Sequence, residues 1–221
     1  MMSHVVVTGS NRGIGLALCQ LFHARGDEVT ATCRVSSPGL DALGVDVFTG
    51  MDVTDEAAIA RLADHVRDRP IDRLVLSAGI MRRQTLGARD AEGIREQFEV
   101  NALGPLRMSG ALAPGMAPGS SIAIITSRMG SIADNTSGGS YGYRMSKAAV
   151  NMAGKSLSHD LKDQGIAVAI LHPGWVQTDM TGHSGHVDAE TAARGLINRM
   201  DELTLETTGS FWHAQGDLLP W

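Results

Sequence analysis

Tyr143 and Lys147 lie four residues apart, a spacing that places a phenol and an ammonium on one face of a helix. An unperturbed tyrosine has a pKa of about 10, which is too high for proton exchange at neutral pH. A neighbouring ammonium stabilises the phenolate and lowers that pKa. The pair could therefore act as a general acid and base, although the spacing alone is common by chance and is usually structural.

Polar side chains elsewhere in the sequence give this pair a context. Ser127 ends the apolar run 121–127, a buried-strand pattern whose carboxyl end should open onto the crevice of an α/β sheet. Asn101 lies in a predicted helix, where Gly104 and Pro105 are expected to disturb the backbone. In this company the tyrosine–lysine pair indicates a functional site.

The first predicted strand runs into a glycine-rich turn that precedes a helical pattern. The turn reads Thr8-Gly9-Ser10-Asn11-Arg12-Gly13-Ile14-Gly15, a spacing that departs from the usual G-x-G-x-x-G fingerprint. Backbone N–H groups in such a turn can approach a pyrophosphate, and the helix dipole favours its negative charge. Because the turn follows the first strand of an alternating α/β chain, we predict a nucleotide site there.

Arginines near this turn bear on the choice of cofactor. An NAD-binding fold usually has an acidic residue about 20 residues past the glycine loop, bonded to the ribose 2′-hydroxyl. Arg34 stands at that position, and Arg12 lies in the loop itself. Two guanidinium groups suit a 2′-phosphate, so we predict NADP(H) rather than NAD(H). Two solvated surface arginines would give the same pattern.

The order of elements predicts the fold. Short β-branched runs alternate with longer helical stretches, which is typical of βαβ units and a parallel sheet. We predict one doubly wound α/β domain of the Rossmann type over residues 1–221. The expected strands are 5–8, 29–33, 45–49, 73–76, 122–126, 166–171 and 211–212; the expected helices follow Gly13 and cover 54–67 (capped by Thr54), 91–116, 141–161 and 189–200.

Composition excludes several classes of function. A chain of 221 residues that is 43% hydrophobic and 19% charged suits one globular core. The net charge of −5 and the pI near 5.9 argue against a nucleic-acid or membrane partner. We find neither a signal-peptide pattern nor an apolar run of about 20 residues, so we expect a cytoplasmic protein. His183 and His186 hint at a metal pair, but no ligand cluster accompanies them and no metal is expected.

Taken together, the motifs resemble the short-chain dehydrogenase/reductase family from end to end. Further shared features are typical of its small branch of C-factor-like and sniffer-like carbonyl reductases. The matching residues are the glycine loop, Asp52-Val53, Ser77-Ala78-Gly79, Asn101, Ser127, Tyr143 with Lys147, and Pro173-Gly174; the branch features are Gly138-Gly139-Ser140-Tyr141, the tract from Tyr143 to Lys147, Trp175-Val176-Gln177-Thr178-Asp179-Met180 and Pro220-Trp221.

The resemblance implies hydride transfer between NADP(H) and a carbonyl or alcohol. It implies that Tyr143 exchanges a proton with the substrate oxygen and that Ser127 orients that oxygen. Lys147, aided by the positive charge of the oxidised nicotinamide, would lower the pKa of Tyr143. Lys147 would also hold the nicotinamide ribose, and Asn101 would support a water relay to Lys147. The residues expected at the cofactor, besides Tyr143 and Lys147, are Gly9, Asn11, Arg12, Gly13, Ile14, Gly15, Arg34, Asp52, Val53, Ser77, Ala78, Gly79, Pro173, Gly174, Val176 and Thr178.

At two positions the sequence departs from the family pattern. The family commonly has asparagine where this chain has Ser77; if that position contributes mainly backbone and packing, Ser77 loosens the site without abolishing binding. Family spacing puts the working serine about a dozen residues before the tyrosine, which selects Ser131 by counting. We nevertheless predict Ser127, because the end of a buried strand fixes geometry better than a count through the turn-rich loop 133–139.

The sequence is compatible with more than one assembly and with two classes of function. The resemblance implies a homodimer or homotetramer that pairs through the helices 91–116 and 141–161. A cofactor-binding sensor or signalling protein of the C-factor type, with little turnover, is the alternative to an enzyme, because a fold alone does not prove activity. The complete set of catalytic residues favours the enzyme, whose partner would be a small carbonyl or alcohol.

Overall fold

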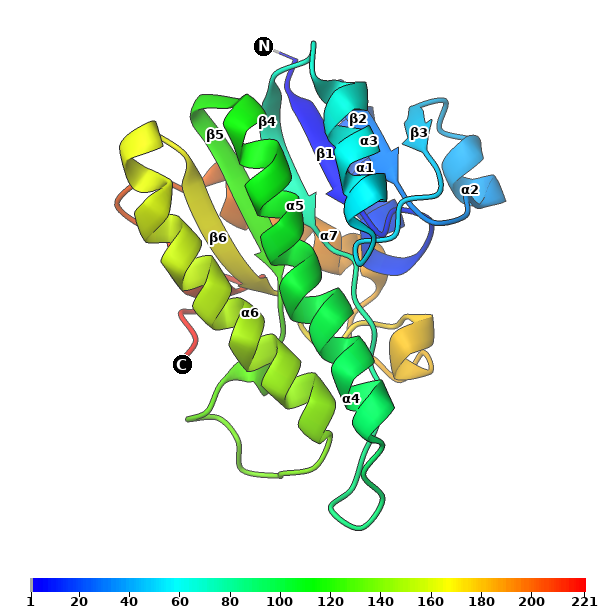
Figure 1. Cartoon of the computed structure of the whole chain (residues 1–221), viewed down its shortest axis with the longest axis vertical. Helices are drawn as coiled ribbons and strands as arrows, with labels where there is room; N and C mark the ends of the chain where they lie inside the picture. The colour runs from blue at the N-terminus through cyan, green and yellow to red at the C-terminus, as the bar shows by residue number, and fades with distance from the viewer. Residues whose placement is uncertain (1) are drawn as a thin grey trace.

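The computed structural model describes residues 2–221, so residue 1 of the predicted domain lies outside the described residues. Within them, a seven-stranded parallel sheet has the order β3-β2-β1-β4-β5-β6-β7. The chain starts at β1 in the middle of the sheet and winds to one edge and then to the other (Figure 1). This topology confirms the predicted doubly wound, Rossmann-type domain. The strands are β1 His4–Thr8, β2 Glu28–Thr32, β3 Asp46–Phe48, β4 Ile71–Leu76, β5 Met116–Ile125, β6 Ala167–His172 and β7 Phe211–His213.

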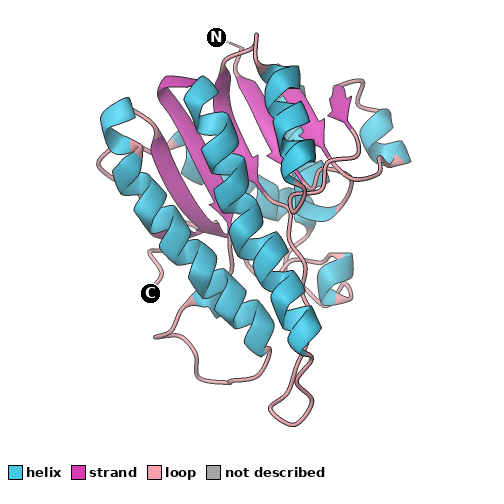
Figure 2. Ribbon diagram, in the orientation of Figure 1, coloured by secondary structure: helices cyan, strands magenta, loops and turns pink. Residues whose placement is uncertain are grey.

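Helices cover both faces of the sheet (Figure 2). On β1, Val6 packs into the core under α3, α5 and α6, whereas Val5 and Val7 pack into the core under α1 and α7. A parallel strand buried on both sides is apolar throughout, which explains its β-branched run. The helices are α1 Gly13–Ala24, α2 Pro38–Asp41, α3 Glu56–Val66, α4 Ala91–Phe98, α5 Gly104–Leu112, α6 Tyr141–Asp160 and α7 Ala189–Asp201.

The helix predicted over 91–116 is interrupted where a disturbed backbone is expected, and its predicted end is wrong. It is divided by a π-helical segment, Glu99–Leu103, in which the Gly104 N–H donates to the Glu99 carbonyl. Pro105 has no N–H to continue the α-helical ladder, so the wider turn before it has a clear cause. Met116, expected at the end of this helix, instead begins β5, six residues earlier than the predicted strand.

Two smaller expectations also differ from the structure. Thr54 does not cap α3; the Asp55 carboxylate accepts from the Ala57 N–H, and Thr54 donates its hydroxyl to Asp52 at 2.7 Å. The short helix α2 was not predicted, because one turn carries too little periodicity to detect. Neither difference moves a strand of the sheet.

Parallel pairing decides where functional side chains collect. Every strand pairing in the sheet is parallel, so the strands end at one edge of the sheet, where the loops after β1, β4, β5 and β6 lie (Figure 1). These loops begin near Gly9, Ser77, Ser127 and Pro173. Open α/β sheets bind ligands at this edge. Within residues 2–221 no helix combines the length and the apolar character that crossing a bilayer requires.

Candidate active site

The glycine loop is a bare backbone cradle. Gly9 has φ +69°, and a Cβ there would lie 2.9 Å from the Ala78 Cα. A Cβ on Gly15 would collide with the Gly9 carbonyl, so no side chain fits between the loop and the start of α1. A Cβ on Gly13, which has φ +53°, would lie 3.3 Å from the methyl group of Thr178. Exposed N–H groups at the start of a helix, with no Cβ in the way, fit a pyrophosphate.

The loop after β4 is fixed against this cradle by Thr8. The Thr8 hydroxyl accepts from the backbone N–H groups of Ser77 and Ala78, at 3.0 and 3.1 Å. The two loops therefore meet through backbone and one buried hydroxyl. Ser77 makes this contact through its backbone N–H. An asparagine, which the short-chain dehydrogenase/reductase pattern commonly has at this position, would donate the same backbone N–H.

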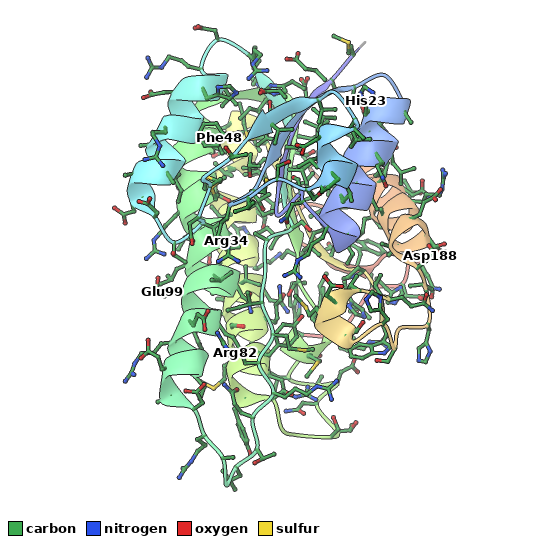
Figure 3. The ribbon with its side chains drawn as sticks, turned by 90° about the vertical axis from the view of Figure 1, so that its right-hand side faces the viewer. His23, Arg34, Phe48, Arg82, Glu99 and Asp188 are labelled. Atoms are coloured by element: carbon green, nitrogen blue, oxygen red, sulfur yellow. The ribbon has the colours of Figure 1, made fainter. Side chains whose placement is uncertain are left out.

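The two arginines predicted at a 2′-phosphate are held by different loops. Arg34 is exposed just beyond β2, on the face turned to the viewer in Figure 3. It lies near Asp52, whose pKa is lowered mainly by the Thr54 N–H and further by the Arg34 charge. Arg12 Nη1 lies 2.8 Å from Asp179 Oδ2 in the loop after β6. Both members of that ion pair are largely exposed, so the pair is weak and Arg12 can exchange partners.

Val53 and Asn11 support the walls of the same region. Val53 is buried against Gly104, where a Cβ would lie 2.9 Å from the Val53 side chain. The Asn11 amide donates to the Val35 carbonyl at 2.9 Å and so ties the glycine loop to the segment after β2. These contacts fix the loop backbones that face the expected adenine end.

Tyr143 and Ser127 line one cleft of about 310 Å³. Burial raises the pKa of Tyr143 to about 12, although a hydrogen bond with Ser127 acts in the opposite direction. The Ser127 hydroxyl also accepts from the Met129 N–H at 3.1 Å. The cleft is completed by residues from the glycine loop, the loops after β4 and β5, the start of α6, and the end of β6 with the segment after it: Ile14, Met81, Thr126, Arg128, Met129, Asp134, Arg144, His172, Pro173, Gly174, Trp175, Val176, Thr178, Met180 and Thr181.

Lys147 is buried behind this cleft beside the π-helical segment. Its Nζ donates to the Ile125 carbonyl at 2.9 Å and lies 5.8 Å from the centre of the Tyr143 ring. Burial lowers the pKa of Lys147 to about 8. A Cβ on Gly79 would lie 3.7 Å from Lys147 Nζ and 3.3 Å from Asn101 Oδ1, so a side chain at position 79 would crowd both groups.

The expected lowering of the tyrosine pKa is not what the protein groups alone produce. Desolvation of the phenolate outweighs the hydrogen bond with Ser127, and Tyr143 stays protonated through the neutral range. A protonated phenol is the form that can donate a proton to an oxygen. The expected lowering includes the positive charge of an oxidised nicotinamide, so it stays a prediction for the protein with its cofactor bound.

Asn101 uses its whole amide to hold the chain. Its Oδ1 accepts from the Ile80 N–H at 2.8 Å, and its Nδ2 donates to the Ile80 carbonyl at 2.8 Å and to Ser146 Oγ at 3.0 Å. The side chain is 1% exposed, which leaves it no room for another partner. Asn101 thus joins the loop after β4 to α6, where its partner Ser146 directly precedes Lys147.

The two candidate serines occupy different positions. Ser127 lies at the end of β5 in the wall of the cleft. Ser131 is buried outside the residues that line the cleft, where its hydroxyl accepts from the Asp134 N–H at 3.1 Å. Ser127 therefore shares the cleft with Tyr143, and Ser131 does not line it.

Sequence reasoning missed several residues at the site. The Gln84 side chain accepts from the Gly142 N–H at 2.9 Å and so positions the start of α6. His172 lines the cleft, and burial lowers its pKa to about 3. Arg144 also lines the cleft. Only its position beside Tyr143 could have drawn attention to Arg144, and Gln84 carries no local signal because its partner is 58 residues away.

Comparison with known proteins agrees with this geometry. Residues 3–188 match the family model described as short chain dehydrogenase. The chain is 42% identical, over the full length of both proteins, to 1-hydroxy-2-glutathionyl-2-methyl-3-butene dehydrogenase of Rhodococcus sp. (strain AD45). It is 45% identical to the C-signal protein of Myxococcus xanthus over 162 residues, which cover 72% of this chain and 98% of that protein. The chain belongs to the short-chain dehydrogenase family, a family of oxidoreductases.

Solved structures narrow the likeness to carbonyl reductases. The NADPH-bound carbonyl reductase from chicken fatty liver superposes with a TM-score of 0.91 at 31% identity, covering 100% of this chain and 99% of that one. The carbonyl reductase Sniffer of D. melanogaster superposes with a TM-score of 0.92 at 29% identity over 100% of both chains. The predicted family and its sniffer-like branch are confirmed, and the NADPH-bound neighbour supports the predicted cofactor.

The contacts of Asn101 predict a cost in stability. Asn101→Ala removes three hydrogen bonds and leaves both backbone groups of Ile80 unpaired, so the free energy of unfolding should fall by about 2–3 kcal/mol. Asn135→Ala is the matched control, because Asn135 makes one bond in an exposed turn and should cost less than about 1 kcal/mol. Urea denaturation measures both variants. Equal losses would show that Asn101 does not tie the loop to α6.

Proposed function

We propose that this protein transfers a hydride between NADP(H) and a carbonyl or secondary alcohol, with Tyr143 as the acid and base. One observation carries the proposal: the hydroxyl groups of Ser127 and Tyr143 share a cleft with Ile14 of the glycine loop and Val176 after β6. An oxygen at the two hydroxyl groups would therefore lie beside a dinucleotide that follows the strand ends. The proposed reaction is an oxidoreduction, as expected for a member of the short-chain dehydrogenase family.

The residues present fit the dinucleotide. The side-chain-free cradle at Gly9, Gly13 and Gly15 accepts a pyrophosphate, and exposed Arg34 suits a 2′-phosphate. When bound, NADPH supplies the hydride. Pro173, Gly174, Val176 and Thr178 line the cleft where its nicotinamide end would lie. The remaining predicted contacts, among them Asp52, Val53 and Ser77-Ala78-Gly79, border the path between these two ends.

The roles of the polar groups follow from their protonation. Tyr143, with a pKa of about 12, holds the proton that carbonyl reduction consumes. Ser127 donates to the same substrate oxygen and orients it. Lys147 is charged below pH of about 8, where its ammonium stabilises the phenolate left after proton transfer. Asn101 supports the proton relay by holding Ile80 and Ser146 next to Lys147.

The alternative is a cofactor-binding signalling protein with little turnover. The 45% identity to C-signal is the observation that favours it. Binding of NADPH without turnover on a broad set of carbonyl compounds and alcohols would support this alternative. The names of the other relatives include a glutathionyl alcohol and 3-oxoacyl carrier-protein substrates, so their shared chemistry is a carbonyl or an alcohol.

Removal of the phenol tests the central role. Tyr143→Phe should lower kcat for a carbonyl substrate by about 10²–10⁴-fold, because only the proton-transfer hydroxyl is lost. The Kd for NADPH, measured by fluorescence titration, should stay unchanged. Tyr141→Phe is the matched control, since Tyr141 lies half a turn away, is exposed and does not line the cleft. Full activity in Tyr143→Phe would remove this residue from its role.

The choice of serine has its own test. Ser127→Ala should lower kcat/KM by about 10²-fold or more, because it removes a donor to the reacting oxygen. Ser131→Ala should change kcat/KM little, since its hydroxyl caps a turn outside the cleft. Parallel assays of the two variants measure the ranking. A reversed ranking would assign the catalytic hydroxyl to the loop after β5.

Arg34 provides the test of cofactor preference. Arg34→Asp should weaken NADPH binding and favour NADH in relative terms, because a carboxylate repels a 2′-phosphate and accepts from a 2′-hydroxyl. Arg61→Asp, on the exposed face of α3, makes the same charge change away from the strand ends. Titration with both cofactors measures the ratio. Equal affinity of the unaltered protein for NADH and NADPH would refute the assignment of Arg34.

We also propose a homodimer or homotetramer that pairs through α4, α5 and α6. Large apolar side chains on α6, Met145 and Met152, are 49% and 68% exposed, and Leu106 on α5 is 43% exposed. Burying them against a second copy would remove this apolar surface from water. Light scattering should give the mass of two or four chains, and a monomer mass at working concentration would contradict the proposal.

A further inference from the structure

The wall of the cleft carries a net positive charge in an acidic protein. Within residues 2–221, its formally charged side chains are Arg128, Asp134 and Arg144. Two cations and one anion leave one positive charge, whereas the whole chain has a net charge of −5. His172 adds no charge, because burial lowers its pKa to about 3. Much of the remaining wall is apolar, with Met129 among its side chains.

The uncompensated charge belongs to Arg144. Arg128 Nε lies 3.1 Å from Asp134 Oδ2, so those two groups neutralise each other. Arg144 donates to the Gly138 and Met129 carbonyls at 3.2 and 3.5 Å and to the Ser137 hydroxyl at 2.8 Å, all of which are neutral. Across the described chain, no carboxylate oxygen lies within 4.0 Å of its guanidinium. A half-buried guanidinium with only neutral acceptors favours an anionic partner.

Arg144 is also placed next to the reacting group. It follows Tyr143 directly on α6, and both residues line the same cleft. Its hydrogen bonds to 137–138 fix the guanidinium against the loop before α6, which limits the rotamers it can adopt. A substrate whose oxygen meets Tyr143 can therefore present a second group to a preorganised cation. Three of the five Arg144 N–H groups donate within the protein, which leaves two for a carboxylate.

We propose that the physiological substrate is an amphipathic carbonyl or alcohol that carries a carboxylate, and that Arg144 binds this carboxylate. The proposal rests on the proposed function for the identity of the reacting group. The contact with the anion depends only on the charges and hydrogen bonds of the cleft wall. Arg144 is thus a specificity-determining residue, because an uncharged analogue of the same shape lacks the charged partner.

Two aldehydes of matched shape test the proposal. The probes are 4-formylbenzoate and 4-formylbenzamide, with NADPH as reductant, and the readout is the ratio of their kcat/KM values. Arg144→Gln should lower the carboxylate-to-amide ratio about tenfold, mainly through KM, because a charge-assisted contact is lost. Asp134→Asn should raise the ratio, since it frees the Arg128 charge. Arg61→Gln, a charge loss outside the cleft, should leave the ratio unchanged.

A merely structural role for Arg144 gives a different pattern. If Arg144 only tethers the loop, Arg144→Gln lowers both kcat/KM values in parallel and Asp134→Asn leaves the ratio unchanged; that result overturns the proposal. Arg144→Lys keeps the charge but loses the fork, so its ratio should lie between those of the unaltered protein and Arg144→Gln. Should Arg144→Gln fail to fold, the direction of the Asp134→Asn effect decides.

Calorimetry separates failure of this proposal from failure of the proposed function. Binding of the two aldehydes to the protein saturated with NADP⁺ needs no turnover. Tighter binding of 4-formylbenzoate than of the amide, lost in Arg144→Gln, supports the anion site even if neither aldehyde is reduced. Equal binding of both probes, or binding of neither, overturns it, whereas reduction of both aldehydes with equal kcat/KM upholds the proposed function alone.

Discussion

A buried ammonium is the constraint on which the candidate site depends. Lys147 is 5% exposed and donates to one protein acceptor, the Ile125 carbonyl at the end of β5. The resulting fall of its pKa from 10.5 to about 8 corresponds to roughly 3 kcal/mol against the charged form. With a pKa of about 8 the group is still mostly protonated at neutral pH, and the surrounding elements hold it beside the cleft. The strand end, α6 and the π-helical segment all serve that purpose.

The π-helical segment explains how the support is built. Pro105 cannot continue the α-helical ladder, so the helix widens at Glu99–Leu103 and turns Asn101 toward the loop after β4. Asn101 then binds Ile80 and Ser146 and closes the space next to Lys147 and Gly79. The irregular stretch of helix therefore positions the site. A regular α-helix would lack this widened turn beside Lys147.

Much of this arrangement could be predicted from sequence because its signals are local. The glycine turn after β1, the alternation of strands and helices, and the four-residue spacing of Tyr143 and Lys147 are contiguous patterns. Ser127 could be selected over Ser131 as the better candidate because the end of a buried strand is also a local signal. In each case the parallel sheet brings the segment with the local pattern to the same edge.

What could not be predicted depends on contacts between distant segments. Arg12 meets Asp179, 167 residues away, and Gln84 holds the start of α6 without any pattern around it. Burial, which raises the pKa of Tyr143 in the protein alone, is also a property of the packed fold and not of a local pattern. The charge of the cleft wall likewise depends on which of two arginines Asp134 neutralises.

The pH dependence of carbonyl reduction tests the role of Lys147 most directly. The measurement is kcat/KM with saturating NADPH from pH 6 to pH 10, for the unaltered protein and for Lys147→Met. The lysine is protonated below its pKa of about 8, and Tyr143 keeps its proton throughout this range. The account predicts that kcat/KM falls as pH rises through about 8 and that Lys147→Met is slow at every pH. A profile that stays flat from pH 6 to pH 10 in the unaltered protein would contradict it.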